Sequence, residues 1–272
     1  MLKRILNNCH HIINAFTFVS LISVSGYSVE LFAANETPSV LPAGNTPNGQ
    51  SVFSTPVATP TATPKPSLTP LPPALTAKSY ILIDADSGKI IVAQNADRHL
   101  PPASLTKMMT SYLASDAIRS GRIKMTDTVP VSEAAWRTGG SKMFIKVGEN
   151  VPVQDILQGI IVDSGNDACV AIAEHLAGSE DAFANLMNQQ AALLGMANTH
   201  FVDANGLPNP QHYSSAKDMA ILARAIIKNF PEDYKWYSQK WFSYRNIKQP
   251  NRNRLLWSDS TVDGLKTGHT DE

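Results

Sequence analysis

A proline- and threonine-rich segment limits how much of this chain can fold into a compact core. Residues 35–76 hold ten of the 18 prolines and eight threonines, with almost no charge and few apolar side chains. Such a segment cannot bury enough apolar surface to order itself, and its prolines favour an extended, partly polyproline II conformation. We therefore expect residues 35–76 to be a linker, with a passive spacer as its simplest role. The folded domain is expected at residues 77–272.

Residues 1–34 have the features of an export signal. Lys3 and Arg4 form a basic start, and Ile12 to Val24 is an apolar run without charge. The run is too short for a comfortable membrane span but suits the core of a secretory signal. A cleaved signal peptide and an uncleaved signal anchor both remain open. We expect export to the periplasm or cell envelope, with membrane association only through this segment if it is uncleaved.

Charge and histidine spacing narrow the range of partners. The formal net charge is zero, so nothing in the composition indicates nucleic acid as a partner. The seven histidines show no metal-ligand spacing, and we expect neither a metal nor a cofactor.

The hydrophobic patterning predicts strands, then helices, then strands. Tyr80–Asp84 and Lys89–Gln94 flank a turn and indicate a hairpin. A helix is expected after Pro101-Pro102, with apolar residues from Leu105 to Ile118 on one face. Further helices are expected at Val153–Val162, Ala168–Leu176, Asp181–Leu194 and Ser215–Lys228, and further strands at Trp241–Tyr244 and Thr261–Thr267. This order predicts an α+β domain whose sheet combines both ends of the chain.

Ser104 and Lys107 form a candidate nucleophile and base. They lie in the stretch PPASLTK, at positions i and i+3 of the first predicted helix. Residues at this spacing share a helix face, so the amine can reach the hydroxyl without help from distant loops. A serine hydroxyl needs such a base, because it is a poor nucleophile until its proton is removed.

Two further short motifs follow the pair later in the chain. Ser164-Gly165-Asn166 lies in VDSGNDA, and Lys266-Thr267-Gly268 lies in VDGLKTGHT. With PPASLTKMMT, SGNDACVAIAEH and YSSAKDMA, they make residues 78–272 resemble the D-alanyl-D-alanine carboxypeptidases of the low-molecular-mass penicillin-binding proteins, the S11 serine peptidases. The resemblance implies the penicillin-binding protein/β-lactamase-like transpeptidase fold, an antiparallel sheet with a helical subdomain. It also implies trimming of D-alanine from peptidoglycan stem peptides and acylation by β-lactam antibiotics.

The resemblance also implies the catalytic roles. Ser104 attacks the carbonyl carbon of the penultimate D-alanine and becomes an acyl-enzyme. Lys107 removes the serine proton as a neutral amine, which burial beside a second cation, Lys266, would favour. Ser164 relays a proton to the departing D-alanine, and Asn166 holds Lys107 and the substrate amide.

The remaining implied residues bind the substrate. Lys266 and Thr267 bind its terminal carboxylate, since an anion calls for a cation and a hydroxyl. Gly268 leaves room for substrate against the strand, and the backbone N–H groups of Ser104 and His269 stabilise the oxyanion.

Two other functions compete with this interpretation. A β-lactamase shares the three motifs, but class A enzymes use a loop glutamate for deacylation. Residues 191–218 contain no glutamate, and S-G-N replaces S-D-N, so the peptidase is favoured. The second alternative is an inactive remnant or a non-catalytic β-lactam-binding protein. The sequence given stops four residues after Gly268, whereas the resemblance implies two more strands and a helix, so we expect the C-terminal strands and helix to be missing and the chain alone to be poorly folded or inactive.

Overall fold

The computed structural model describes residues 74–269, which lie in one compact unit, Pro66–Glu272. The predicted signal at residues 1–34 lies outside the described residues, as does the predicted linker up to residue 73. The helices are α1 (Lys107–Arg119), α2 (Glu133–Arg137), α3 (Val153–Gln158), α4 (Asn166–Ala177), α5 (Glu180–Leu194), α6 (Ala216–Asn229), α7 (Pro231–Tyr234) and α8 (Leu255–Ser258), with 3-10 turns η1 (Ala103–Thr106) and η3 (Lys235–Ser238) and a π-helical turn η2 (Gly159–Asp163). The strands are β1 (Tyr80–Ile83), β2 (Ile90–Gln94), β3 (Thr128–Pro130), β4 (Asn150–Pro152), β5 (Trp241–Tyr244) and β6 (Ile247–Pro250).

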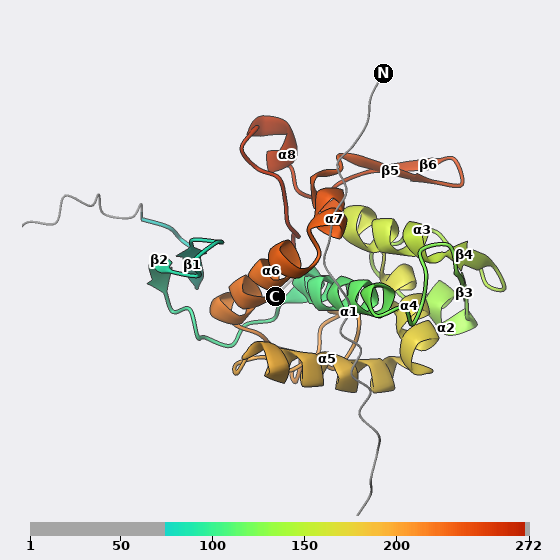
Figure 1. Ribbon diagram of the computed structural model, residues 1–272, viewed down its shortest axis with the longest axis horizontal. Helices are drawn as coiled ribbons and strands as arrows, with labels where there is room; N and C mark the ends of the chain where they lie inside the picture. The colour runs from blue at the N-terminus through green and yellow to red at the C-terminus, as the bar shows by residue number, and fades with distance from the viewer. Residues whose placement is uncertain (1–73, 270–272) are drawn as a thin grey trace, which may run out of the picture. The chain divides into compact units, whose positions relative to one another are not determined.

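Helix α1 is the centre of the hydrophobic core. Its residues from Lys107 to Ser115 are all buried, including Met109, which is fully enclosed. Figure 1 shows α1 in the middle of the helices, and it contacts α4, α5 and α6. The first residue of this enclosed helix is Lys107, and Ser104 lies in the preceding turn η1.

Local capping signals fix the ends of the surrounding helices. The Ser179 hydroxyl accepts from the backbone N–H of Ala182 at the start of α5, and the Ser215 hydroxyl accepts from that of Asp218 at the start of α6. Each bond satisfies one of the backbone donors that a helix leaves unpaired at its first turn. Ser215, the first residue of the predicted helix Ser215–Lys228, is therefore the N-cap of α6.

The strands form three separate two-stranded antiparallel sheets, β1-β2, β3-β4 and β5-β6. The predicted N-terminal hairpin and the strand Trp241–Tyr244 are confirmed. The predicted strand Thr261–Thr267 is wrong, and so is the single sheet joining both ends of the chain. A strand exists only through hydrogen bonds to a neighbour, and none of the described segments pairs with residues 261–267.

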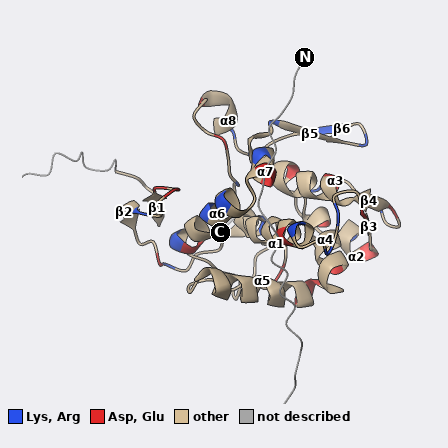
Figure 2. Cartoon of the chain, viewed as in Figure 1, with Lys and Arg blue, Asp and Glu red and all other residues tan. Residues whose placement is uncertain are grey.

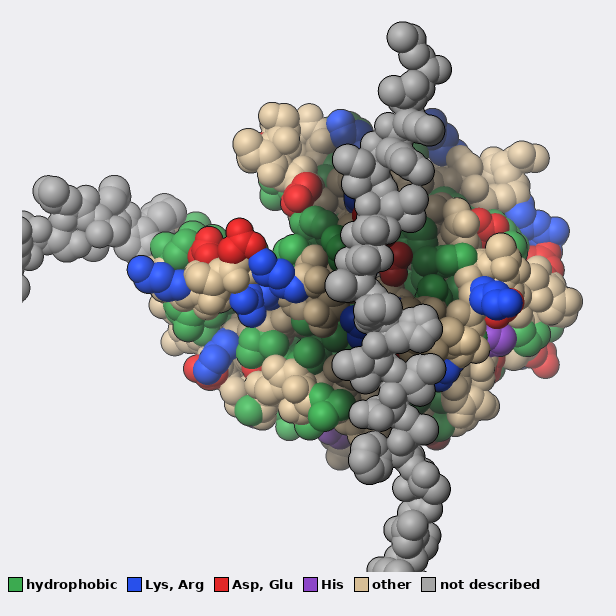
Figure 3. Space-filling view, in the orientation of Figure 1, with side chains coloured by type: hydrophobic (Ala, Val, Ile, Leu, Met, Phe, Trp, Pro, Cys, Tyr) green, Lys and Arg blue, Asp and Glu red, His purple; other side chains and the backbone are tan. Residues whose placement is uncertain are grey.

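The β1-β2 hairpin exposes several apolar side chains. Leu82, Ile90 and Ile91 are each at least half exposed, while β1 packs against α6. Hydrophobic and charged side chains therefore lie together on this part of the surface (Figure 3). Basic and acidic residues are also interspersed along the chain, for example on α6 and α7 (Figure 2). Within residues 74–269, no helix has the length and apolar character needed to cross a membrane.

Candidate functional site

The candidate nucleophile and base meet at the junction of η1 and α1. Ser104 lies in η1, directly after Pro101-Pro102, and Lys107 is the first residue of α1. The Lys107 Nζ atom is 2.9 Å from Ser104 Oγ. The i, i+3 spacing thus brings the amine within hydrogen-bonding distance of the hydroxyl.

Lys107 is held in a setting that favours its neutral form. Its side chain is 1% exposed, and its Nζ donates to the backbone carbonyl of Asn205 at 2.5 Å. Burial lowers the pKa of Lys107, while Cys169 and Asp203 act in the opposite direction. A neutral lysine amine has a free lone pair, which is what a base for Ser104 requires.

The second motif forms a tight turn after a π-helical segment. Turn η2 ends at Asp163, and Ser164 adopts a left-handed backbone conformation with φ of 62°. This conformation is unfavourable for serine and is held from outside, since the Ser141 hydroxyl donates to the Ser164 carbonyl at 2.5 Å. The turn places Ser164 on the wall of the same cleft as Ser104.

Asn166 is anchored by the loop containing Gly139 rather than by Lys107. Its amide nitrogen donates to the Gly139 carbonyl at 2.7 Å, and a Cβ atom on Gly140 would lie 2.5 Å from that nitrogen. Among the described residues no hydrogen bond joins Asn166 to Lys107, so this part of the implied role stays a prediction. Asn166 Oδ1 is buried without a hydrogen-bond partner in the described structure.

A buried carboxylate next to the motif holds the neighbouring loop. Asp167 Oδ1 accepts from the backbone N–H of Met143, and Oδ2 accepts from that of Phe144. Burial raises the pKa of Asp167, and these backbone hydrogen bonds oppose the rise. Asp167 thereby fixes the segment that carries Ser141 against the Ser164 turn, a role that the sequence analysis missed.

The third motif lines the same cleft as Ser164 through Thr267 and Gly268. Lys266 is partly buried, and its pKa is lowered to about 7, first by burial and then by the nearby charge of Lys107. Its Nζ donates to the Thr267 carbonyl at 3.2 Å. The effect of Lys107 on the pKa of Lys266 is therefore present, whereas the pKa of Lys107 is lowered by burial, and the expected effect of Lys266 on it stays a prediction.

Gly268 packs against the protein itself. A Cβ atom at this position would lie 2.9 Å from the Pro102 carbonyl and 3.3 Å from the Ala103 side chain. The sequence analysis expected the missing side chain to make room for substrate. In the structure it also lets the third motif approach the turn that carries Ser104, and the room for substrate stays a prediction.

Residues of all three motifs line one open cleft of about 440 Å³. Its lining residues are Ser104, Ser141, Ser164, Arg252, Thr267, Gly268 and His269. Arg252 and Ser141 were not predicted, because each reaches the cleft from a segment without a recognised motif. Arg252 is an exposed cation between two buried residues, Asn251 and Asn253, and that pattern is its only local signal. Within residues 74–269, no cluster of three His, Cys, Asp or Glu residues could hold a metal ion.

Comparison with known proteins assigns the chain to a family. Residues 66–272 match the peptidase S11 family, described as D-alanyl-D-alanine carboxypeptidase. The chain belongs to the peptidase S11 family. It is 50% identical over 207 residues to D-alanyl-D-alanine carboxypeptidase DacA of Escherichia coli K12, covering 74% of this chain and 51% of that protein. It is 42% identical over 205 residues to DacF of Bacillus subtilis 168, covering 72% of this chain and 51% of that protein.

Solved structures of S11 relatives support the same assignment. Penicillin-binding protein 5 of Haemophilus influenzae superposes with a TM-score of 0.72 at 49% identity, covering 74% of this chain and 60% of that chain. Penicillin-binding protein 6B of Escherichia coli superposes with a TM-score of 0.72 at 46% identity, covering 75% of this chain and 67% of that chain. The predicted α+β penicillin-binding fold is therefore confirmed. The chain spans about half the length of the curated relatives it matches.

Proposed function

We propose that the protein is a serine-type D-alanyl-D-alanine carboxypeptidase that acts through an acyl-enzyme on Ser104. The observation that carries the proposal is the contact of 2.9 Å between Ser104 Oγ and the buried Lys107 amine, whose pKa is lowered. A general base must lie within hydrogen-bonding reach of the proton that it removes, and Lys107 meets this condition. The pair opens into a cleft wide enough for a peptide end.

The residues of the cleft account for each step of the reaction. Lys107 takes the Ser104 proton as Oγ attacks the carbonyl carbon of the penultimate D-alanine. The bond from that carbon to nitrogen then breaks, and Ser164 passes a proton to the departing D-alanine nitrogen. The backbone N–H groups of Ser104 and His269 stabilise the negative oxygen that forms in between. Water finally hydrolyses the ester and restores Ser104.

The substrate is a peptide with a free terminal carboxylate, as in a peptidoglycan stem peptide. Lys266 and Thr267 supply the cation and hydroxyl that bind this carboxylate, and Arg252 adds a second cation on the same cleft. Asn166 follows closely after Ser164, which lines this cleft, and its role toward the substrate amide is the one that the family resemblance implies.

β-Lactam antibiotics are the expected inhibitors. Penicillin-binding protein D2 of Listeria monocytogenes, 30% identical to this chain, has been solved in an ampicillin-bound and a cefotaxime-bound form. By analogy, a β-lactam carbonyl would acylate Ser104 here and leave a stable ester.

Fluorescent penicillin and a peptide ending in D-Ala-D-Ala test the proposal on the full chain. Wild-type protein should be labelled once per molecule and should release D-alanine, while Ser104→Ala should do neither. Thr110→Ser, which keeps its hydroxyl but faces the core, serves as a folding control. Absence of labelling in a folded wild-type protein would refute the proposal. Rapid turnover of a chromogenic cephalosporin would instead identify a β-lactamase.

We further propose that the protein is exported to the periplasm or cell envelope. The basic start and apolar run of residues 1–34 and the linker that follows support this location. Cell fractionation with an antibody against the domain tests it, and recovery of the protein in the cytoplasm alone would refute it.

A further inference from the structure

One loop contacts Lys107 and the residue before Ser104, and it is not explained by the three motifs. The DANG loop, Asp203–Gly206, brings the Asn205 carbonyl to 2.5 Å from Lys107 Nζ. Its Gly206 has φ of 84°, and a Cβ atom there would lie 1.9 Å from the Ala103 carbonyl oxygen, directly before Ser104. The loop therefore forms one wall of the pair and contacts it through backbone atoms, which side-chain motifs do not reveal.

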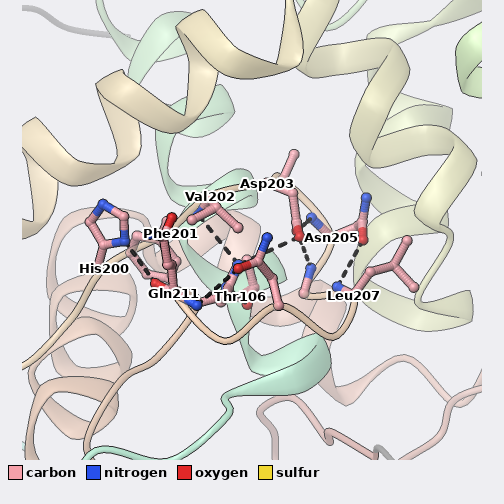
Figure 4. A network of polar contacts seen from close by, with 12 residues as sticks. Thr106, His200, Phe201, Val202, Asp203, Asn205, Leu207 and Gln211 are labelled. Atoms are coloured by element: carbon pink, nitrogen blue, oxygen red, sulfur yellow. Dashed lines mark hydrogen bonds and ion pairs between the residues drawn. The ribbon is translucent and has the colours of Figure 1, made fainter.

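Asp203 shapes the loop from within. Its Oδ1 accepts from the backbone N–H of Asn205 at 2.9 Å and from that of Gly206 at 2.5 Å (Figure 4). Burial alone would raise the pKa of Asp203, but hydrogen bonds from His212, Gly206 and Asn205 outweigh burial and the pKa is lowered. The carboxylate is therefore ionised at neutral pH and turns the Asn205 carbonyl away from itself, toward Lys107.

His212 ties this carboxylate to the helix of the pair. Its Nδ1 accepts from the backbone N–H of Val202 at 3.3 Å and lies 3.5 Å from Asp203 Oδ2, and its Nε2 is 2.8 Å from the Thr106 hydroxyl. His212 is 3% exposed and Thr106 is fully buried. A hydroxyl can donate or accept, so the contact with Thr106 persists whichever ring nitrogen carries the proton. A continuous chain of contacts thus runs from Asp203 to the residue beside Lys107.

The far side of the loop is fixed separately. Glu180 Oε1 accepts from the backbone N–H of Ala204 and from the Asn205 side chain, at 3.0 and 3.1 Å. The Thr110 hydroxyl donates to the Ala204 carbonyl at 2.6 Å. These contacts hold the loop at Ala204, whereas the orientation of the Asn205 carbonyl depends on the two N–H groups bound by Asp203.

We propose that Asp203 and His212 are positioning residues for acylation, because they hold the Asn205 carbonyl against one N–H of Lys107 so that the amine lone pair faces Ser104. A neutral amine has two N–H groups and one lone pair, and a carbonyl oxygen only accepts. Binding one N–H to Asn205 therefore fixes the rotation of the amine about its carbon. This inference rests on the proposed function and adds to it the residues that aim its base.

Acylation kinetics test the inference on the full chain. Fluorescent penicillin is mixed with each variant over a range of concentrations, which separates the acylation rate constant from the dissociation constant of the noncovalent complex. Asp203→Ala and His212→Ala should each lower the rate constant roughly 10- to 100-fold, the cost of misplacing a reacting group by about 1 Å. The dissociation constant should not change, since neither residue lines the cleft.

The double variant and conservative variants distinguish positioning from a general loss of structure. Residues that act as one unit are not additive, so the double variant should be no slower than the slower single variant. His212→Gln should recover part of the rate, because its amide can reach Thr106. His200→Ala is the matched control, since its Nδ1 contacts Gln211 in the same region without touching the DANG loop (Figure 4).

A pH profile decides the matter if the alanine variants do not fold. The charges that act on Lys107 or share its surroundings come from Asp203, Cys169 and Lys266, and Asp203 raises the pKa of Lys107. Asp203→Asn removes this charge and keeps an acceptor oxygen, so the rise of the acylation rate with pH should move to lower pH. An unmoved profile, or wild-type rates in both alanine variants, would overturn the inference. A crystal structure of His212→Ala with the Asn205 carbonyl still bonded to Lys107 would also overturn it, whether or not the wild type is active.

Discussion

Replacing Asp163 by asparagine should stabilise the protein at alkaline pH and have a smaller effect near pH 4. Asp163 is fully buried beside Ser164, and neither of its carboxylate oxygens has a hydrogen-bond partner in the described structure. The nearby amide of Gln249 donates to the Lys142 carbonyl instead. Burial raises the pKa of Asp163 from 3.8 to about 7, with Arg252 opposing the rise.

The direction of the effect follows from proton linkage. The folded state holds the Asp163 proton more tightly than the unfolded state, so the protein loses stability as the pH rises from about 4 to about 7. A shift of about 3 pKa units corresponds to about 4 kcal/mol at 1.36 kcal/mol per unit, and asparagine stays neutral throughout. The stability advantage of Asp163→Asn should therefore widen by up to about 4 kcal/mol between about pH 4 and pH 8.

Thermal melts followed by circular dichroism between about pH 4 and pH 8 measure this difference. For a domain of this size the widening corresponds to roughly 10 °C in Tm. The matched control is Asp181→Asn, an exposed carboxylate whose replacement should shift the Tm by a similar amount at every pH. A pH-independent difference between wild type and Asp163→Asn would show that Asp163 is solvated or paired, and the reasoning from burial would fail.

Three further substitutions address the site and its supporting glycines. Lys266→Arg should keep the affinity for a carboxylate-terminated peptide above about pH 7, where the wild-type lysine loses its charge. KM measured from about pH 6 to pH 9 checks this, and the same pH dependence of KM in wild type and variant would contradict it. Gly206→Ala should cost more than about 2 kcal/mol in urea unfolding, because a Cβ atom would meet the Ala103 carbonyl, whereas Gly178→Ala, with similar φ but open space, should cost about 1 kcal/mol. Gly268→Ala should slow acylation by fluorescent penicillin without a comparable loss of Tm, since it pushes the third motif away from the turn that carries Ser104.

Local sequence signals predicted the parts of the fold that depend on near neighbours. The spacing of Ser104 and Lys107 places both groups on one helix face in any α-helix, and the Ser215 cap needs only residues three positions apart. The helix predicted at Val153–Val162 was only partly right, because α3 passes into the π-helical turn η2 before Ser164. Helical periodicity does not distinguish these two forms over so few residues.

Long-range contacts were beyond the sequence analysis. The segment 261–267 has strand-forming residues, yet strand formation depends on a partner, and the described residues supply none. Arg252 reaches the cleft and Asn205 reaches Lys107 from loops with no periodic pattern, and the contact from Asn205 uses a backbone carbonyl that every residue possesses. Such contacts depend on how the helices pack.

The sequence by itself determined the family, the fold class and the choice of Ser104 and Lys107 as the candidate pair, because each motif carries its chemistry in residue types at short, fixed spacing. Only the tertiary structure decided how that chemistry is tuned. It buries Lys107 against the Asn205 carbonyl. It also brings Lys266 close to Lys107, whose charge helps burial to lower the pKa of Lys266, and it leaves the Asp163 carboxylate without a hydrogen-bond partner in the described structure. Burial and Coulomb interactions depend on distances between segments that lie far apart in the chain, and these distances are set by packing.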